Sequence, residues 1–243
     1  MMTEIWAHRG ASGYEPENTL EAFELAARMG ADAVELDVQM SRDGDLVVIH
    51  DETTTRVSGV KLWVKDCSLQ ELKALNVNQT LPMHTPVHIP TLQEVYDLLK
   101  PTGLRVNVEL KTGVVFYPQI EAAVLKAAKD MGMEERVIYS SFNHYTLRRI
   151  KELNPQAETG MLYADGIWQS AAYGVILGVD ALHPALYNLQ YPGFMEQARE
   201  KGLKVHVWTV NEEEHLRQMK KMNVDAVITN YPDRARKIVT AGA

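Results

Sequence analysis

The sequence has only one cysteine, Cys67, among 243 residues, so no disulfide bond can form within the chain. A lone thiol fits a reducing compartment, and we expect a cytoplasmic protein. No apolar run approaches the roughly 18–20 residues that a membrane span needs, so none is expected. The opening residues, MMTEIWAHRG, have neither the basic region nor the apolar stretch of a secretory signal, and none is predicted.

Positive charge is also scarce. The chain has 25 Lys and Arg against 32 Asp and Glu, for a net charge of −7, and both signs are mixed along it. A nucleic-acid-binding protein would show a basic stripe, and a peripheral membrane anchor a polybasic cluster. We therefore expect a small-molecule substrate, with no nucleic-acid partner. The sequence leaves the oligomeric state open.

Short apolar runs rich in β-branched residues alternate with segments of helical periodicity. Helices are predicted over Ile120–Met131 and Glu212–Met222, for example, and the first helix begins at Asn18 as N-cap, with Glu21 in the capping-box position. The predicted strands are Glu4–Ala7, Asp32–Val38, Arg105–Leu110, Arg136–Ser141, Glu158–Tyr163, Val179–His183, Lys204–Thr209 and Asp225–Thr229.

Eight such units in a chain of this length predict an α/β protein with the (β/α)8 TIM barrel fold, as a single domain over residues 1–243. No G-x-G-x-x-G motif follows the first strand, which counts against a dinucleotide-binding sheet.

One segment breaks the alternation, directly after the second predicted strand. Asp43-Gly44 is a strong hairpin signal. A turn centred there would fold the next strand back antiparallel and place His50 opposite Asp37. From residue 52 to residue 90 the barrel rhythm is lost, so we predict an inserted subdomain there, on the same end of the barrel as His50.

Acidic side chains are predicted to converge at the C-terminal end of the barrel. Residues i and i+2 of a strand share a face, so Glu35 and Asp37 point the same way, and Glu109 ends the next barrel strand. Carboxylates this close raise one another's pKa unless a cation lies between them. Oxygen ligands suit a hard divalent ion, so we predict one Mg²⁺ or Ca²⁺. The lack of Cys/His ligand spacing argues against Zn²⁺.

Basic side chains are predicted around the same mouth. His8 and Arg9 end the first strand, Lys111 ends another, and His50 arrives on the hairpin. Arginine offers a planar fork for phosphate oxygens and lysine a point charge, while two histidines could act as acid and base. Each residue alone is more often structural. Their joint placement at one rim is what predicts a phosphoester site.

Four motifs resemble the glycerophosphodiester phosphodiesterases, which are TIM barrels of the phospholipase C-like class. The motifs are AHRGASGYEPENTLEAF, VELDVQMSRDGDLVVIHD, VELK and VHVWTVN, and the match spans nearly the whole chain. The resemblance implies metal-dependent hydrolysis of glycerophosphodiesters to sn-glycerol 3-phosphate and an alcohol, through a cyclic phosphate formed by a neighbouring substrate hydroxyl. The implied residues are the acid/base pair His8 and His50, the metal ligands Glu35, Asp37 and Glu109, and the phosphate contacts Arg9 and Lys111.

Other rim residues are predicted to contact the substrate less directly. Trp208 and Phe142 are expected to form an apolar wall for the glycerol part. His183 is a further candidate pocket residue, with a structural role as the alternative. The family commonly has T-D-x-P near its end, whereas this chain has TNYP, so Asn230 cannot carry the usual negative charge.

Two alternative functions stay open. A related lysophospholipase D or phosphoinositol-type phosphodiesterase would favour exposed apolar residues around the mouth, and the insertion has only scattered ones. A catalytically inactive barrel used as a binding module would lack a histidine or a carboxylate of the site, and all of them are present.

Overall fold

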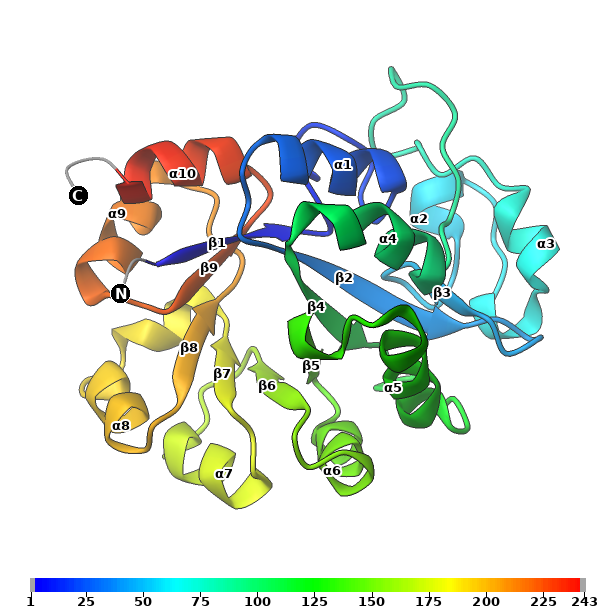
Figure 1. The fold of residues 1–243 in the computed structure, drawn as a ribbon. Helices are drawn as coiled ribbons and strands as arrows, with labels where there is room; N and C mark the ends of the chain where they lie inside the picture. Colours follow the sequence, from blue (N-terminus) through cyan, green and yellow to red (C-terminus); the bar gives the residue numbers. More distant parts are fainter. Residues whose placement is uncertain (1–2, 241–243) are drawn as a thin grey trace.

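Parallel strands form a closed ring with helices around it in the computed structural model, which describes residues 3–240 (Figure 1). Neighbouring strands follow the order β1-β9-β8-β7-β6-β5-β4-β2, and the pairing of β1 with β2 closes the ring. The predicted TIM barrel is therefore confirmed. The ring consists of β1 (Glu4–His8), β2 (Ala33–Met40), β4 (Arg105–Leu110), β5 (Val137–Ser141), β6 (Glu158–Tyr163), β7 (Ala181–Pro184), β8 (Lys204–Val207) and β9 (Ala226–Thr229).

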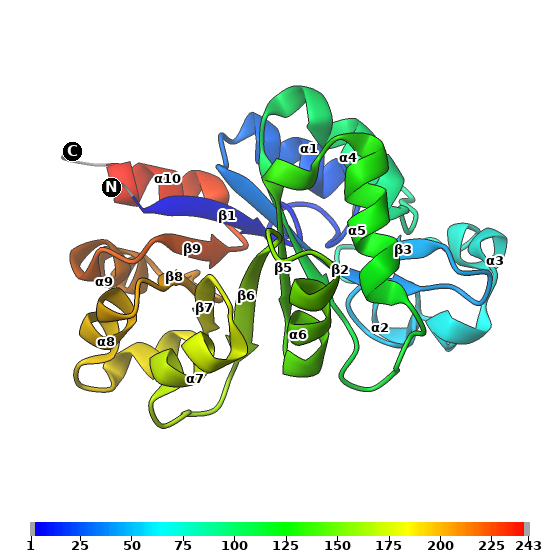
Figure 2. The ribbon, with the colours of Figure 1, turned by 60° about the horizontal axis from the view of Figure 1, so that its bottom comes forward.

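The helices cover the outside of the ring (Figure 2). They are α1 (Leu20–Arg28), α4 (Leu92–Leu99), α5 (Ile120–Met131), α6 (His144–Leu153), α7 (Ser170–Leu177), α8 (Phe194–Glu200), α9 (Glu213–Met222) and α10 (Pro232–Thr240). Short 3-10 turns are η2 (Lys100–Thr102), η3 (Glu134–Arg136) and η4 (Leu186–Gln190). None of the helices within residues 3–240 is long and apolar enough to cross a membrane.

The first helix begins one residue later than predicted. Thr19 is the N-cap of α1, and its side chain accepts a hydrogen bond from the Ala22 N–H. Asn18 instead has a left-handed backbone, with φ +58°, and its amide donates to Asp37 Oδ2 at 2.9 Å. Both residue types cap helices well, and Thr19 is the N-cap because the Asn18 side chain is bonded to Asp37.

Side chains fill the inside of the barrel, so the ring is a packed core and not a pore. Trp6 and Ile138 are buried there in one apolar cluster, and the ring of His206 lies 4.3 Å from that of Trp6. Larger apolar clusters fill the space between strands and helices. The site residues at the barrel mouth thus stand on a rigid base.

The hairpin after β2 has a longer loop than predicted. The Ser41 N–H donates to Asp45 O at 2.9 Å, which leaves residues 42–44 as a three-residue loop. Gly44 ends this loop in the left-handed region, with φ +91°. A left-handed glycine at the end of a three-residue loop is a common hairpin design, distinct from the two-residue turn expected at Asp43-Gly44.

The longer loop shifts the strand register by one residue. Ile49, and not His50, lies across from Asp37, and its N–H donates to Asp37 O at 2.9 Å. The returning strand β3 (Leu46–Val48) ends before His50. The predicted pairing of His50 with Asp37 is therefore wrong in register, and His50 lies in the segment that follows the strand.

Residues after β3 pack around an apolar cluster of their own. This segment contains α2 (Thr55–Ser58), η1 (Val64–Asp66) and α3 (Leu69–Lys73). Cys67 and Leu72 are among the buried members of its cluster, together with Val47 and Ile49 from the hairpin. The boundaries 52–90 stay a prediction, since this small core also includes residues that precede them.

Candidate active site

Strand register places the predicted acidic residues side by side. Parallel pairing sets His8 opposite Glu35, and Asp37 opposite Glu109. His8 and Glu109 lie at the C-terminal ends of β1 and β4, where TIM barrels form their active sites, and β2 continues past this level into the hairpin. One ligand oxygen from each of Glu35, Asp37 and Glu109 lies within 4.8 Å of the others.

The three carboxylates are almost fully buried. Burial, and then repulsion from the other two carboxylates, raises the pKa of Glu35 well above its usual range. Burial also raises the pKa of Glu109, although Lys111 offsets part of the effect. Burial acts on Asp37 in the same direction, but the charge of Arg9 and other cations outweighs it and holds the pKa of Asp37 low. The surrounding positive charge therefore compensates Asp37, but it does not fully compensate Glu35 and Glu109.

Two cations lie beside the carboxylates. Arg9 Nε is 3.3 Å from Asp37 Oδ2, and Arg9 NH1 donates to Glu17 Oε1 at 2.9 Å. Lys111 Nζ donates to Glu109 Oε1 at 2.8 Å. Arg9 is predicted to contact a phosphate. Its guanidinium is in fact held in place by Glu17 and Asp37.

The loop after β1 has a strained backbone that serves the site. Arg9 lies in the left-handed region, with φ +54°, and its N–H donates to Glu35 Oε2 at 3.0 Å. Gly10 follows with φ +79°, and a Cβ there would lie 2.7 Å from the backbone of Ala22. Strain of this kind costs free energy and concentrates at functional sites.

A divalent cation fits the carboxylate cluster. Asp37 Oδ1 is buried and has no hydrogen-bond partner among residues 3–240, while its other oxygen accepts from Asn18. Lys111 Nζ is too far from Asp37 Oδ1, at 3.7 Å, for a hydrogen bond. Three buried carboxylates with a free oxygen are the ligand set that Mg²⁺ or Ca²⁺ prefers.

His8 is oriented by Asn230, which lies beyond the last barrel strand. The two side chains meet at 2.7 Å, from His8 Nδ1 to Asn230 Oδ1. An amide oxygen only accepts, so His8 Nδ1 carries the proton and Nε2 has a free lone pair, 4.0 Å from Glu35 Oε2. Burial, and then the charge of Arg9, lowers the pKa of His8 to about 4. His8 is therefore a neutral imidazole near pH 7.

His50 is oriented by a carboxylate and a chain of ion pairs. His50 Nδ1 lies 2.6 Å from Asp51 Oδ1, and Asp51 Oδ2 in turn accepts from Arg56 Nε at 2.8 Å. Arg56 also donates to Glu17 Oε2 at 2.6 Å. Because Glu17 holds Arg9 as well, one continuous network joins the two halves of the site.

Most of the predicted residues line one small cavity at the barrel mouth, of about 110 Å³. On its apolar side, the rings of Phe142 and Trp208 meet edge to face at 5.5 Å. Asp37 and Lys111 lie behind this lining, within the carboxylate cluster. The lining residues are His8, Arg9, Glu35, His50, Asn107, Glu109, Phe142, Leu162, Trp208 and Ile228.

His183 does not reach this cavity, which corrects its predicted place among the substrate contacts. Its side chain is fully buried inside the barrel, where its Nε2 lies 2.8 Å from His206 Nδ1. Gly160 on β6 makes room for it, since a Cβ there would lie 2.1 Å from His183 Nε2. Only the backbone of His183 serves the site, by accepting a hydrogen bond from Trp208 Nε1 at 2.8 Å.

Sequence reasoning missed several residues that support the site. Asp51 directly follows His50, and its side chain contacts the His50 ring. Asn107 lines the cavity two residues before Glu109, a spacing that could have identified it. Arg56 gave no signal, because its contact with Glu17 depends on how the inserted segment folds over the first loop.

Comparison with known proteins identifies the family of the chain. The model of the glycerophosphoryl diester phosphodiesterase family matches residues 8–234. The chain belongs to this family. It is 41% identical to a glycerophosphodiester phosphodiesterase of Caldanaerobacter subterraneus subsp. tengcongensis, over 100% of both chains. It is 38% identical to one of Bacillus altitudinis, over 98% of each chain.

Solved structures of the family have the same fold. A phosphodiesterase of Oleispira antarctica, in complex with the product sn-glycerol-3-phosphate, has a TM-score of 0.88 at 28% identity and covers 99% of this chain and 98% of its own. A glycerophosphodiester phosphodiesterase of Agrobacterium tumefaciens has a TM-score of 0.85 at 27% identity, over 99% of this chain and 100% of its own. The protein is thus an enzyme of the glycerophosphoryl diester phosphodiesterase family. Its buried acidic cluster is suited to a divalent cation.

Proposed function

We propose that the protein hydrolyses glycerophosphodiesters to sn-glycerol 3-phosphate and an alcohol, with one bound Mg²⁺ or Ca²⁺. The observation that carries the proposal is the meeting of three buried carboxylates and two oriented histidines at one small cavity. The relative that was solved with sn-glycerol-3-phosphate supports the product class.

Glu35, Asp37 and Glu109 would hold the cation. When bound, it supplies positive charge that neutralises the phosphate and lowers the pKa of a nearby hydroxyl. Arg9 would contact a phosphate oxygen, because it lines the cavity next to the carboxylates. Lys111 adds positive charge from behind Glu109.

His8 and His50 would move the protons. The 2-hydroxyl of the glycerol attacks phosphorus and gives its proton to the free Nε2 of His8, while the bond from phosphorus to the alcohol oxygen breaks. That oxygen takes a proton from His50, whose ring is held by Asp51. Water then opens the cyclic phosphate with the two roles reversed, and the 2-oxygen regains its proton. An internal nucleophile benefits from high effective molarity, so no protein nucleophile is required.

The inserted segment completes this assignment. We propose that residues 52–90 border the pocket and influence which alcohol group is accepted. His84 lies 2.8 Å from Glu15 in the first barrel loop, from Nδ1 to Oε2, and Arg56 contacts Glu17 in the same loop. The segment is thus tied directly to the loop that carries Arg9.

An assay of phosphodiester cleavage tests the proposal. Purified protein would be given glycerophosphocholine, glycerophosphoethanolamine or a lysophospholipid, in EDTA and with added Mg²⁺ or Ca²⁺. We expect metal-dependent release of sn-glycerol 3-phosphate from the first two substrates. His8→Ala and His50→Ala should each lose at least ~10²-fold in turnover. His215→Ala, which changes an exposed histidine on α9, is the matched control.

Three results would contradict the proposal. Full activity after prolonged dialysis against EDTA would exclude the metal. Near-normal turnover of His8→Ala or His50→Ala would exclude the acid/base assignment. Cleavage of the lysophospholipid alone would instead favour the lysophospholipase D alternative.

A further inference from the structure

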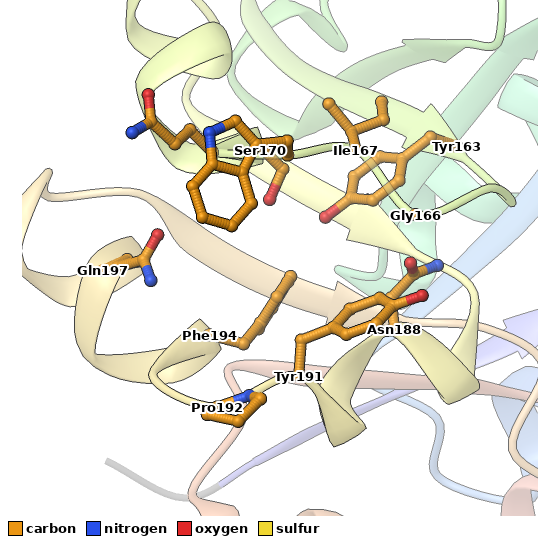
Figure 3. A pocket seen from close by; sticks show the side chains of 11 residues that line it. Tyr163, Gly166, Ile167, Ser170, Asn188, Tyr191, Pro192, Phe194 and Gln197 are labelled. Carbon is orange, nitrogen blue, oxygen red and sulfur yellow. The ribbon is translucent and has the colours of Figure 1, made fainter.

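A second cavity lies outside the barrel ring, between the loops that follow β6 and β7 (Figure 3). Its volume of about 470 Å³ is within the range of small-molecule sites. Tyr163 lines this cavity, while the preceding residue, Leu162, lines the catalytic one. Successive residues of a strand point to opposite faces, so β6 separates the two cavities.

Aromatic rings make up much of the wall. Tyr163 and Ser170 lie on one side of the cavity, and Tyr191 and Phe194 lie on the other (Figure 3). Trp168 also lines it and is 87% exposed, an unusual position for the largest apolar side chain. No charged side chain of the described residues lines the cavity. The wall therefore offers no partner for a phosphate and no carboxylate for an amine.

One polar group in the wall lacks a partner. The Tyr163 side chain is only 4% exposed, and its hydroxyl makes no hydrogen bond of ordinary geometry within residues 3–240, although the Ser170 side chain lies beside it. Figure 3 shows this hydroxyl pointing into the cavity. Buried hydroxyls without partners are uncommon because they lose their bonds to water. A ligand hydroxyl at this place would satisfy it.

Neutral amides complete the polar part of the wall. Asn188 donates its side-chain N–H to Ala164 O at 2.8 Å, which leaves its oxygen on the cavity side (Figure 3). Gln197 faces the same space from α8. Amides and hydroxyls both donate and accept hydrogen bonds, as the hydroxyl groups of a polyol do.

We propose that this cavity binds an uncharged polyhydroxy compound of the sugar or cyclic polyol class. Such a compound has apolar C–H faces, which would pack on the aromatic rings, and a rim of hydroxyls, which would pair with Tyr163, Asn188 and Gln197. The proposal goes beyond the proposed hydrolysis, because no residue of the carboxylate cluster or of the histidine pair takes part.

Calorimetric titration of the full chain tests this site. The probes are methyl glucoside, myo-inositol and mannitol as uncharged compounds, and choline as a cation. We expect at least one uncharged probe to bind saturably. Trp168→Ala should weaken that binding at least tenfold, and Tyr163→Phe, which removes a single hydroxyl, about tenfold.

Tyr96→Phe is the matched control. The Tyr96 hydroxyl is also buried without a hydrogen-bond partner in the described chain, but it lies between α4 and the strands, away from this cavity. Tyr96→Phe should bind the probe as the unaltered protein does. Tyr163→Phe should unfold at the same temperature as the unaltered protein or higher, because the lost hydroxyl had no partner.

Three results would overturn the proposal. The first is failure of every uncharged probe to bind. The second is unchanged binding in both Tyr163→Phe and Trp168→Ala. The third is binding of choline that is tighter than that of every uncharged probe and is weakened by Trp168→Ala, which would show that the aromatic rings bind a cation. Because binding is measured without a phosphodiester, each result is separate from the test of hydrolysis.

Discussion

Replacing Asn230 by aspartate should change the titration of His8. The substitution keeps the shape and still accepts the Nδ1 proton across 2.7 Å, but it adds a negative charge. An opposite charge this close raises a histidine pKa by about 1–3 units. From a starting pKa of about 4, His8 should therefore titrate near ~6 in Asn230→Asp. At pH 7 the protonated fraction would rise from about 0.1% to about 10%.

The effect on catalysis follows from the sign of this shift. His8 must be unprotonated to accept a proton, and a higher pKa makes it protonated over a wider pH range. The acid limb of the pH profile of kcat/KM should therefore move up by about two pH units, with little change above pH 8. The variant also restores the T-D-x-P pattern, so its active-site geometry should be preserved.

NMR titration of the metal-free protein measures the shift directly. The ring carbon signals of His8 would be followed from pH 3 to pH 9 in the unaltered protein and in Asn230→Asp. Asn154→Asp is the control, because it adds the same charge after α6, at the opposite end of the barrel. A His8 pKa that moves by less than ~0.5 units in Asn230→Asp, or equally in Asn154→Asp, would refute this account of how His8 is held neutral.

Three further predictions concern the metal and the barrel core. Glu35→Gln should bind Mn²⁺ at least ~10-fold more weakly by calorimetry, because one ligand is lost. Without metal it should unfold at a higher temperature than the unaltered protein, because one repelling carboxylate is gone. A lower unfolding temperature would contradict the assigned repulsion. Burial lowers the pKa of His183 to about 3, so the folded state binds fewer protons below pH 6.5 and loses stability as pH falls. In urea unfolding between pH 7 and pH 5, His183→Gln should lose about 2 kcal/mol less stability than the unaltered protein, and parallel curves would exclude this cause. Gly160→Ala should lower the free energy of unfolding by about 3 kcal/mol or more, because its Cβ would meet the buried His183 ring at 2.1 Å. Gly174→Ala, whose nearest neighbours are leucine side-chain ends at 3.0 and 3.1 Å, should lower it by under ~1 kcal/mol. Equal losses would show that the barrel interior can rearrange around the added methyl group.

The barrel itself could be predicted from the sequence because its signal is repeated. Each strand is short and apolar, and each is followed by a helix with its own period, so an error in one unit does not change the fold. The α5 helix was predicted with its observed bounds, Ile120–Met131. The hairpin lacked such repetition, and one extra residue in its loop shifted the register by one.

The site was predictable where strand geometry alone fixes it. Glu35, Asp37 and Glu109 follow from i, i+2 spacing and from the alignment of parallel strands. His183 also ends a strand, but whether it points to the mouth or into the core depends on Gly160, on the neighbouring strand. Contacts such as Arg56 with Glu17 depend on the fold of an irregular segment, which no periodic pattern describes.

The closure of the ring has a consequence for how the protein is made. β9 joins β1 across more than two hundred residues, and Asn230, just past β9, supplies the hydrogen bond that orients His8. A ribosome adds about 5–20 residues per second from the N-terminus. Most of the strands therefore emerge seconds before the last one does. His8 is among the first residues to leave the ribosome, yet it is oriented only once nearly all of the chain has followed. A truncated or half-made chain should therefore carry every proposed metal ligand and still be inactive.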